Sequence, residues 1–273
     1  QKEDRFNFSQ NYIPDGYREI LLPANEDGTH KLDKGALHIW PRGRFMLIAL
    51  PNEDGSFTCT LFMPHEGGEN SFDQVNTKEE VDSFFKTTFP DFYDLMPDIA
   101  DHWENHPLSS LAIMRCYPWH MGKTALMGDA AHATVPFYGQ GMNAGFEDCT
   151  VMSELMDKHG EDWKAIFEEY SLLRKPDGDA LQELSLYNYV EMRDLVGDPM
   201  FLLRKKIEGK FAAIYPDLWM PLYSQVTFSD IRYSVAFERG QFQRSIMDEV
   251  MKTPNIEEIW DSEEIMEKIK MKA

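Results

Sequence analysis

Residues 125–149 read Ala-Leu-Met-Gly-Asp-Ala-Ala-His-Ala-Thr-Val-Pro-Phe-Tyr-Gly-Gln-Gly-Met-Asn-Ala-Gly-Phe-Glu-Asp-Cys. The stretch opens as a short apolar strand, turns at Gly128 and Asp129, crosses a loop that contains Pro136, and begins a helix near Gly141. A carboxylate at a strand end can accept hydrogen bonds from hydroxyl groups, and a helix N-terminus carries positive partial charge. This order indicates a site for an anionic, polyhydroxylated cofactor. The simpler interpretation is a strand-turn-helix connection whose glycines serve only the turn.

The run from Gly128 to Cys149 resembles the GD motif of the FAD-dependent aromatic hydroxylases, and its part from Val135 onward is similar to the members that act on L-kynurenine. The resemblance extends from about residue 5 to residue 250. It implies a flavoprotein monooxygenase that uses FAD, NADPH and O2 in tryptophan catabolism and pyridine nucleotide biosynthesis. Such an enzyme hydroxylates L-kynurenine to 3-hydroxykynurenine through a C4a-hydroperoxyflavin. The resemblance implies no catalytic acid or base in this chain, because the ring amine activates its own ortho position.

The resemblance also implies which residues hold the cofactor. In the family, the aspartate of this motif binds the ribityl chain of FAD, and the following loop lies along the isoalloxazine edge. The helix N-terminus then faces flavin N1 and the C2 carbonyl, where its dipole stabilises the negative charge of the reduced ring. A helix-cap or turn role is the alternative for the aspartate. The predicted cofactor-binding residues are Asp129, Pro136, Gly139, Gln140, Gly141, Met142 and Asn143.

A β-hairpin is predicted upstream of this motif. The apolar, β-prone runs Phe45–Leu50 and Ser56–Met63 are separated by the turn sequence Pro-Asn-Glu-Asp-Gly. The resemblance implies that one face of the hairpin roofs the substrate pocket, whereas packing on a core is the alternative for most of these side chains. Alternation along the strands assigns to that face Met46, Ile48, Leu50, Thr60 and Phe62.

Two polar residues in the C-terminal half are predicted to contact the substrate. Asn188 stands in Leu-Tyr-Asn-Tyr-Val-Glu-Met-Arg and Tyr223 in Trp-Met-Pro-Leu-Tyr-Ser-Gln-Val, and both segments resemble the same members. There, matching residues help to hold the substrate carboxylate, for which an amide and a phenol are suitable donors. The alternatives are a solvent-facing helix position for Asn188 and packing for Tyr223. Phe137 and Tyr138, between the cofactor loop and these segments, can stack on a substrate ring.

The predicted fold class is α+β, with a β-sheet substrate domain, a strand-loop-helix segment of an FAD-binding domain and a C-terminal helical region. The corresponding ranges are residues 1–115, 116–160 and 161–273. A helix is predicted from Trp163 to Leu173, with a break around Pro176, because proline fits the first turn of a new helix. Residues 178–196, 200–214 and 240–270 are also predicted to be helical.

The amino-acid composition limits the kinds of molecule that the chain is expected to bind. A net charge of -20 and a pI near 4.7 argue against nucleic acid and anionic membranes. The three cysteines form no Cys-x-x-Cys and no histidine cluster has metal-ligand spacing, which favours a protein without a metal site and a reducing, cytoplasmic location. The sequence shows no signal peptide and no long apolar run, so no membrane anchor is expected in this chain. A homodimer is left open.

The sequence contains no Gly-x-Gly-x-x-Gly after a first strand. It is therefore expected to be the C-terminal part of a larger flavoprotein, without the segment that grips the adenine end of FAD. Two other functions are kept open. One is a related aromatic hydroxylase that acts on another ring, and the other is a non-catalytic fragment that only binds a ligand or a partner.

Overall fold

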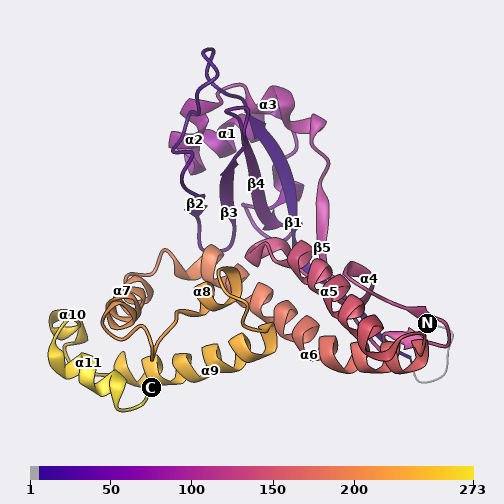
Figure 1. Ribbon diagram of the computed structural model, residues 1–273. Coiled ribbons are helices and arrows are strands. Elements are labelled where there is room, and N and C mark those ends of the chain that lie inside the picture. Colours follow the sequence, from indigo (N-terminus) through magenta and orange to yellow (C-terminus); the bar gives the residue numbers. More distant parts are fainter. Residues whose placement is uncertain (1–5) are drawn as a thin grey trace. The chain divides into compact units, whose positions relative to one another are not determined.

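A computed structural model describes residues 6–273 and divides the chain into two compact units, each of which is described by itself. The sheet unit comprises Tyr12–Leu111 and Val190–Gly197. The helical unit comprises the residues up to Asn11 together with Ala112–Tyr189 and Asp198–Ala273. An antiparallel sheet combined with many helices confirms the predicted α+β class (Figure 1).

The sheet has five strands in the order β2-β3-β4-β1-β5. Their bounds are β1 Asn7–Leu22, β2 His38–Pro41, β3 Met46–Pro51, β4 Phe57–Pro64 and β5 Ser109–Tyr117. The predicted hairpin is β3 and β4, which pair antiparallel across a tight turn. Gly55 in this turn has φ +90°, and a Cβ atom there would lie 2.4 Å from the Gly28 carbonyl oxygen. Only glycine therefore fits this position, which fixes where the hairpin turns.

The register confirms the predicted faces of the hairpin. Directly opposed residues of an antiparallel pair share a face. Met46 opposes Phe62 and Ile48 opposes Thr60, whereas Leu47 opposes Leu61 on the other face. The Leu47 face packs on helices α1 (Lys78–Thr88), α2 (Pro90–Leu95) and α3 (Ile99–His102) through a core rich in phenylalanine (Figure 1). Two short 3-10 turns, η1 (Phe72–Gln74) and η2 (Trp103–Asn105), complete this layer.

A capping box opens α1. The Thr77 side chain accepts from the Glu80 N–H at 3.3 Å, and the Glu80 carboxylate accepts from the Thr77 N–H at 2.9 Å. Two backbone donors that the helix itself leaves unpaired are satisfied in this way. Pro90 follows the helix and starts α2, since proline is tolerated in the first turn of a helix.

The helical unit begins with a two-stranded hairpin and continues as helices. The hairpin is β6 (His120–Met121) with β7 (Thr124–Ala125). The helices that follow are α4 (Asp129–His132), η3 (Pro136–Tyr138), α5 (Gly141–His159), α6 (Trp163–Val190), α7 (Pro199–Ile214), α8 (Leu222–Thr227), α9 (Tyr233–Val250), α10 (Ile256–Ile259) and α11 (Glu263–Lys270). A π-helix, η4 (Glu191–Leu195), belongs to the sheet unit. Between Phe6 and the C-terminus, no helix combines the length and apolarity that crossing a membrane requires.

The predicted helix break at Pro176 is wrong, because α6 continues through this residue. Proline removes one backbone donor from a helix and normally bends or ends it. Here, contacts from outside the helix hold the segment. Arg174 is buried and donates to Asp148, and the Arg232 side chain donates to the Leu173 carbonyl at 2.5 Å. Tertiary hydrogen bonds therefore override the local signal.

The predicted continuous helix over residues 240–270 is also wrong in its bounds. α9 begins earlier, at Tyr233, and the helical structure is interrupted twice before Lys270. Asn255 adopts a left-handed conformation with φ +55°, which no α-helix continues through. Ser262 then accepts a hydrogen bond from the Ile265 N–H and starts α11 as an N-cap.

Candidate cofactor and substrate site

A cleft of about 560 Å³ lies in the helical unit where the loop after α4 meets the start of α5. Five of the seven predicted cofactor residues line it, namely Asp129, Pro136, Gly139, Gly141 and Met142. The remaining lining residues are Gly128, Thr134, Val135 and Gly145. The fold therefore brings together residues from the turn, the loop and the helix that the sequence pattern had grouped.

Backbone geometry opens this cleft to a ligand. Gly139 ends η3 with φ +67°, and a Cβ atom there would meet no other atom within 4 Å, so the chain turns without filling the cleft. The Ala144 N–H makes the first helical hydrogen bond of α5, to the Gln140 carbonyl at 2.9 Å. The N–H groups that precede it have no partner within the helix and carry the positive end of the dipole. Asp129 is exposed in the same cleft.

This lining fits the ribityl and isoalloxazine part of FAD. Asp129 offers a carboxylate for sugar-like hydroxyls, and the start of α5 offers N–H donors for an electron-rich ring edge. The Thr134 hydroxyl also belongs to this site, and the sequence reading missed it. Its Oγ1 is buried and has no hydrogen-bond partner among residues 6–273. The only sequence signal was its place in the same loop, next to Val135.

The two other predicted cofactor residues, Gln140 and Asn143, do not line the cleft. Gln140 is buried, and its Oε1 accepts from Asn143 Nδ2 at 2.9 Å and from the Tyr233 hydroxyl at 3.2 Å. Burial raises the pKa of Tyr233 to about 12, so this hydroxyl remains a donor. In this structure both residues brace the first turn of α5, and a direct contact with the cofactor stays a prediction.

Four of the predicted substrate residues gather around η3. Phe137 stacks on Tyr189 with ring centroids 4.2 Å apart, and Tyr138 stacks on Tyr223 at 5.7 Å. Asn188 donates from Nδ2 to the Phe137 carbonyl oxygen at 2.7 Å. Tyr223 is 48% exposed, whereas the other three predicted residues are buried. The cofactor loop and the predicted carboxylate-binding residues are therefore in direct contact.

The remaining predicted substrate residues lie in the sheet unit and share one face of the β3–β4 hairpin. Met46, Ile48, Thr60 and Phe62 are buried, although they are not part of the core cluster on the opposite face. Leu50 differs, with 46% of its surface exposed. Among the predicted residues of this face only Thr60 carries a hydroxyl, and Thr58, which opposes Leu50, adds a second one. The role of this mostly apolar face as a substrate roof stays a prediction.

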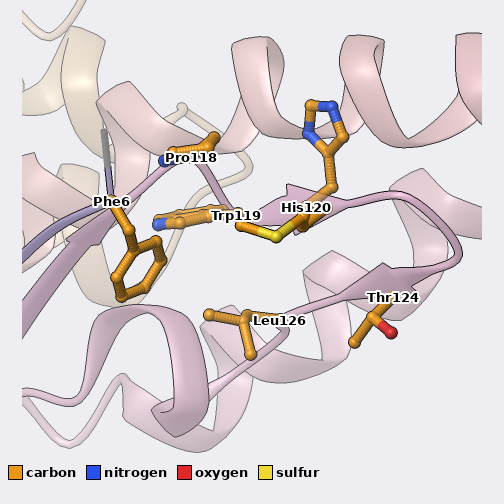
Figure 2. Close-up of a pocket in the computed structure, with 7 residues that line it drawn as sticks. Phe6, Pro118, Trp119, His120, Thr124 and Leu126 are labelled. Atoms are coloured by element: carbon orange, nitrogen blue, oxygen red, sulfur yellow. The ribbon is translucent and has the colours of Figure 1, made fainter. Parts of the chain in front are cut away.

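A second cavity in the helical unit, of about 190 Å³, lies at the β6–β7 hairpin (Figure 2). Its lining is almost wholly apolar and contains none of the predicted site residues: Phe6, Pro118, Trp119, His120, Met121, Thr124 and Leu126. The His120 Nδ1 atom lies 3.0 Å from the Ser171 hydroxyl. Nothing in this lining offers a group for acid-base or redox chemistry beyond that paired histidine. Within residues 6–273, no group of three or more His, Cys, Asp or Glu side chains could hold a metal ion.

Comparison with known proteins shows the family of the chain. The family model described as FAD binding domain matches residues 29–183, more than half of the chain. The chain belongs to this FAD-binding domain family. The matched range contains both the β3–β4 hairpin and the cleft, so the family model covers parts of both units.

Three relatives of this chain, from two bacteria and a slime mould, are named kynurenine 3-monooxygenase. The chain is 56% identical over 270 residues to kynurenine 3-monooxygenase of Christiangramia forsetii and 54% identical to that of Flavobacterium johnsoniae. Each of these alignments covers 98% of this chain but 60% of the relative, so the chain spans about three fifths of the relatives' length. The kynurenine 3-monooxygenase of Dictyostelium discoideum is 43% identical over 264 residues, which are 92% of this chain and 57% of that protein.

A solved structure shows the same fold. The tetrameric form of 2-methyl-3-hydroxypyridine-5-carboxylic acid oxygenase aligns with a TM-score of 0.54 at 18% identity, over 66% of this chain and 48% of that chain. At this identity the match describes the fold alone.

Proposed function

We propose that this chain is part of an FAD-dependent monooxygenase that hydroxylates L-kynurenine to 3-hydroxykynurenine. The observation that carries the proposal is the 56% identity, over 98% of the chain, to a protein named kynurenine 3-monooxygenase. The cleft supports it, because an exposed carboxylate and a helix N-terminus face one cavity there. NADPH as the reductant, and oxygen transfer from the C4a atom of the flavin, belong to the same proposal.

Within this proposal, the chain binds and orients while FAD supplies the activation of O2. Asp129 accepts hydrogen bonds from the ribityl hydroxyls, and the Gly139–Gly141 loop leaves room for the ring. The start of α5 stabilises negative charge on the pyrimidine edge of the ring without a proton transfer. No side chain of this chain needs to act as an acid or a base.

The substrate carboxylate is proposed to meet Asn188 and Tyr223, and Phe137 and Tyr138 are proposed to line the ring site. Both residues that would contact the carboxylate pack directly on η3. The substrate and the cofactor would therefore bind to side chains that are in contact with one another. A roof that excludes water from the substrate site is proposed for the mostly apolar hairpin face, which consists of Met46, Ile48, Leu50, Thr60 and Phe62. A cytoplasmic location, a possible homodimer and the assignment of residues 1–115 as the substrate-binding domain are parts of the same proposal.

The test is a pair of measurements on the purified flavoprotein of which this chain is expected to form the C-terminal part, supplied with FAD. The first is FAD binding, which is measured by the quenching of flavin fluorescence and by absorbance near 450 nm, a general property of oxidised flavin. The second is NADPH oxidation with L-kynurenine, with product mass as the readout. Wild type is expected to bind FAD and to add one oxygen atom to kynurenine, and Asp129→Ala is expected to weaken FAD binding.

Two results would change this conclusion. Faster NADPH oxidation with a phenol than with kynurenine would indicate an aromatic hydroxylase that acts on another ring. A protein that binds no FAD at saturating concentration would contradict the cofactor role of the cleft and favour a non-catalytic, ligand-binding chain. The Asp129→Asn variant controls for charge, because it keeps a hydrogen-bonding side chain of the same size.

A further inference from the structure

Asp148 is a fully buried carboxylate on α5 that was not among the predicted site residues. Its Oδ2 atom accepts from the Gly128 N–H at 2.9 Å and from His132 Nε2 at 2.7 Å. Its Oδ1 atom accepts from Arg174 Nε at 2.7 Å. An ionised carboxylate only accepts, so the proton of the His132 hydrogen bond resides on Nε2. Three donors from two separate segments, residues 128–132 and α6, therefore converge on one side chain.

Two of these bonds tie both ends of the short segment that carries Asp129. Gly128 precedes α4 with φ +56° and ψ -139°, and His132 is the last residue of α4. A Cβ atom on Gly145 of α5 would lie 3.8 Å from the Gly128 Cα atom, so the backbones of the turn and the helix are in contact. Asp129 lies between the two tied ends, exposed, and lines the cleft.

The third bond fixes the carboxylate itself. Arg174 on α6 is 5% exposed and also donates to Asp177 and to the Ala144 carbonyl, each at 3.2 Å. A buried carboxylate without a matching cation is strongly destabilising, so Arg174 determines where Asp148 can stand. Burial works against ionisation of Asp148, but the hydrogen bonds from His132, Arg174 and Gly128 hold its pKa below the ordinary value.

We propose that Asp148 is a positioning residue for the cofactor, which sets the distance between the Asp129 carboxylate and the N-terminus of α5. This inference rests on the proposed function. The two ligand-binding parts of the cleft come from different elements, and Asp148 connects them because it belongs to α5 and holds the turn before α4. A ribityl chain on Asp129 and a ring edge on α5 need a fixed spacing, which a loose turn would not provide. A purely structural ion pair would affect stability alone.

The experiment compares Asp148→Asn with Asp177→Asn. Asp177 is an equally buried carboxylate that shares Arg174, but its other partners are Arg232 and Ser234 rather than Gly128. Hydrogen–deuterium exchange of residues 127–133 is measured in the apoprotein, and FAD affinity and thermal unfolding are measured alongside. Both variants are expected to unfold at lower temperature. Only Asp148→Asn is expected to speed amide exchange at Gly128 and to weaken FAD binding, each by roughly tenfold or more, the factor expected for a lost hydrogen bond to a charged acceptor.

Equal exchange at Gly128 in the two variants would overturn the proposal, as would fast exchange in Asp148→Asn with unchanged FAD affinity. If Asp148→Asn does not fold, His132→Ala removes one of the three donors and is measured in the same way, with the same expected direction. A wild-type protein that binds no FAD, while Asp148→Asn still speeds exchange at Gly128, would contradict the proposed function alone, because the tether is then demonstrated in the apoprotein.

Discussion

The side-chain Nδ2 of Asn188 donates a hydrogen bond to the main-chain carbonyl oxygen of Phe137 at 2.7 Å. This bond joins the C-terminal end of α6 to η3 in the cofactor loop, and Asn188 is buried beside it. The adjacent Tyr189 stacks on the ring of the same Phe137. Asn188, which is proposed to bind the substrate, therefore also supports the loop that is proposed to bind the flavin. Variants must separate these two roles.

Asn188→Ala is expected to lower the free energy of unfolding by about 1–3 kcal/mol, because the buried Phe137 carbonyl loses its donor. If Asn188 also holds the substrate carboxylate, KM for L-kynurenine rises by roughly tenfold, the effect of one charge-assisted hydrogen bond. Urea unfolding and steady-state kinetics measure the two effects. Unchanged turnover and unchanged kynurenine affinity would remove Asn188 from the substrate site.

The control for this variant is Gln182→Ala. Gln182 is also a buried amide on α6, and its Nε2 donates to the carbonyl oxygens of Met114 and Ala133. A similar loss of stability is expected, without a change in KM for kynurenine. A matching rise of KM in both variants would show that the loss of packing, rather than of a substrate contact, is being measured.

Tyr223→Phe is expected to raise KM for L-kynurenine while changing stability by less than about 0.5 kcal/mol. The substitution removes the phenol donor but keeps the ring that stacks on Tyr138. Tyr223→Ala also removes the stacking, which contributes about 0.5–1.5 kcal/mol, so stability is expected to fall in that variant. Identical kinetics of Tyr223→Phe and wild type would show that Tyr223 has only a packing role.

Local patterns predicted those parts of the fold that depend on neighbouring residues. The β3–β4 faces follow from strict alternation and from a turn that only Gly55 fits, and the observed register places Met46 opposite Phe62 on the predicted face. The capping box at Thr77 depends on a local pattern of the same kind, since its partners are three residues apart. The grouping of Asp129 with the start of α5 was likewise visible in one continuous stretch.

What the sequence did not reveal depends on residues far apart in the chain. Gly128 and Asp148 are separated by 20 positions, and Arg174 reaches Asp148 from another helix. The same long-range contacts keep α6 continuous through Pro176. One signal was present: Asp148 lies on the buried face of α5 with Ala144 and Leu155. A carboxylate in an apolar stripe predicts a buried partner, which a search for charged residues alone does not find.

Gly128→Ala is expected to destabilise the protein by about 1–3 kcal/mol and to weaken FAD binding. Gly128 has φ +56° and ψ -139°, a conformation that residues with a Cβ atom rarely adopt. Gly68→Ala is the matched control, because a Cβ atom there meets nothing within 4 Å and its φ lies outside the strained range. Thermal unfolding and FAD titration of both variants test this. Equal behaviour of the two would mean that the turn before α4 relaxes without affecting the cleft.

The stabilising effect of Asp148 is expected to disappear in acid. Burial alone would raise the pKa of Asp148, but hydrogen bonds from His132, Arg174 and the Gly128 N–H lower it from 3.8 to about 2. Because the folded state binds this proton less readily than the unfolded state, the ionised carboxylate contributes stability above pH 3.8 that is lost as the pH falls through about 2. The difference in unfolding free energy between wild type and Asp148→Asn is therefore expected to be constant near neutral pH and to shrink between these two values.

Urea unfolding at a series of pH values measures this difference, and amide exchange at Gly128 reports on the same proton. Protonation removes the charge that Arg174 balances and weakens the bond to the turn, so exchange at Gly128 is expected to accelerate in wild type over the same pH range. A free-energy difference that stays constant down to pH 2 would mean that the Asp148 proton is not coupled to folding. Because the stability term and the exchange at Gly128 depend on one carboxylate, they are expected to change together, and a shift of only one of them would separate the ion pair from the tether.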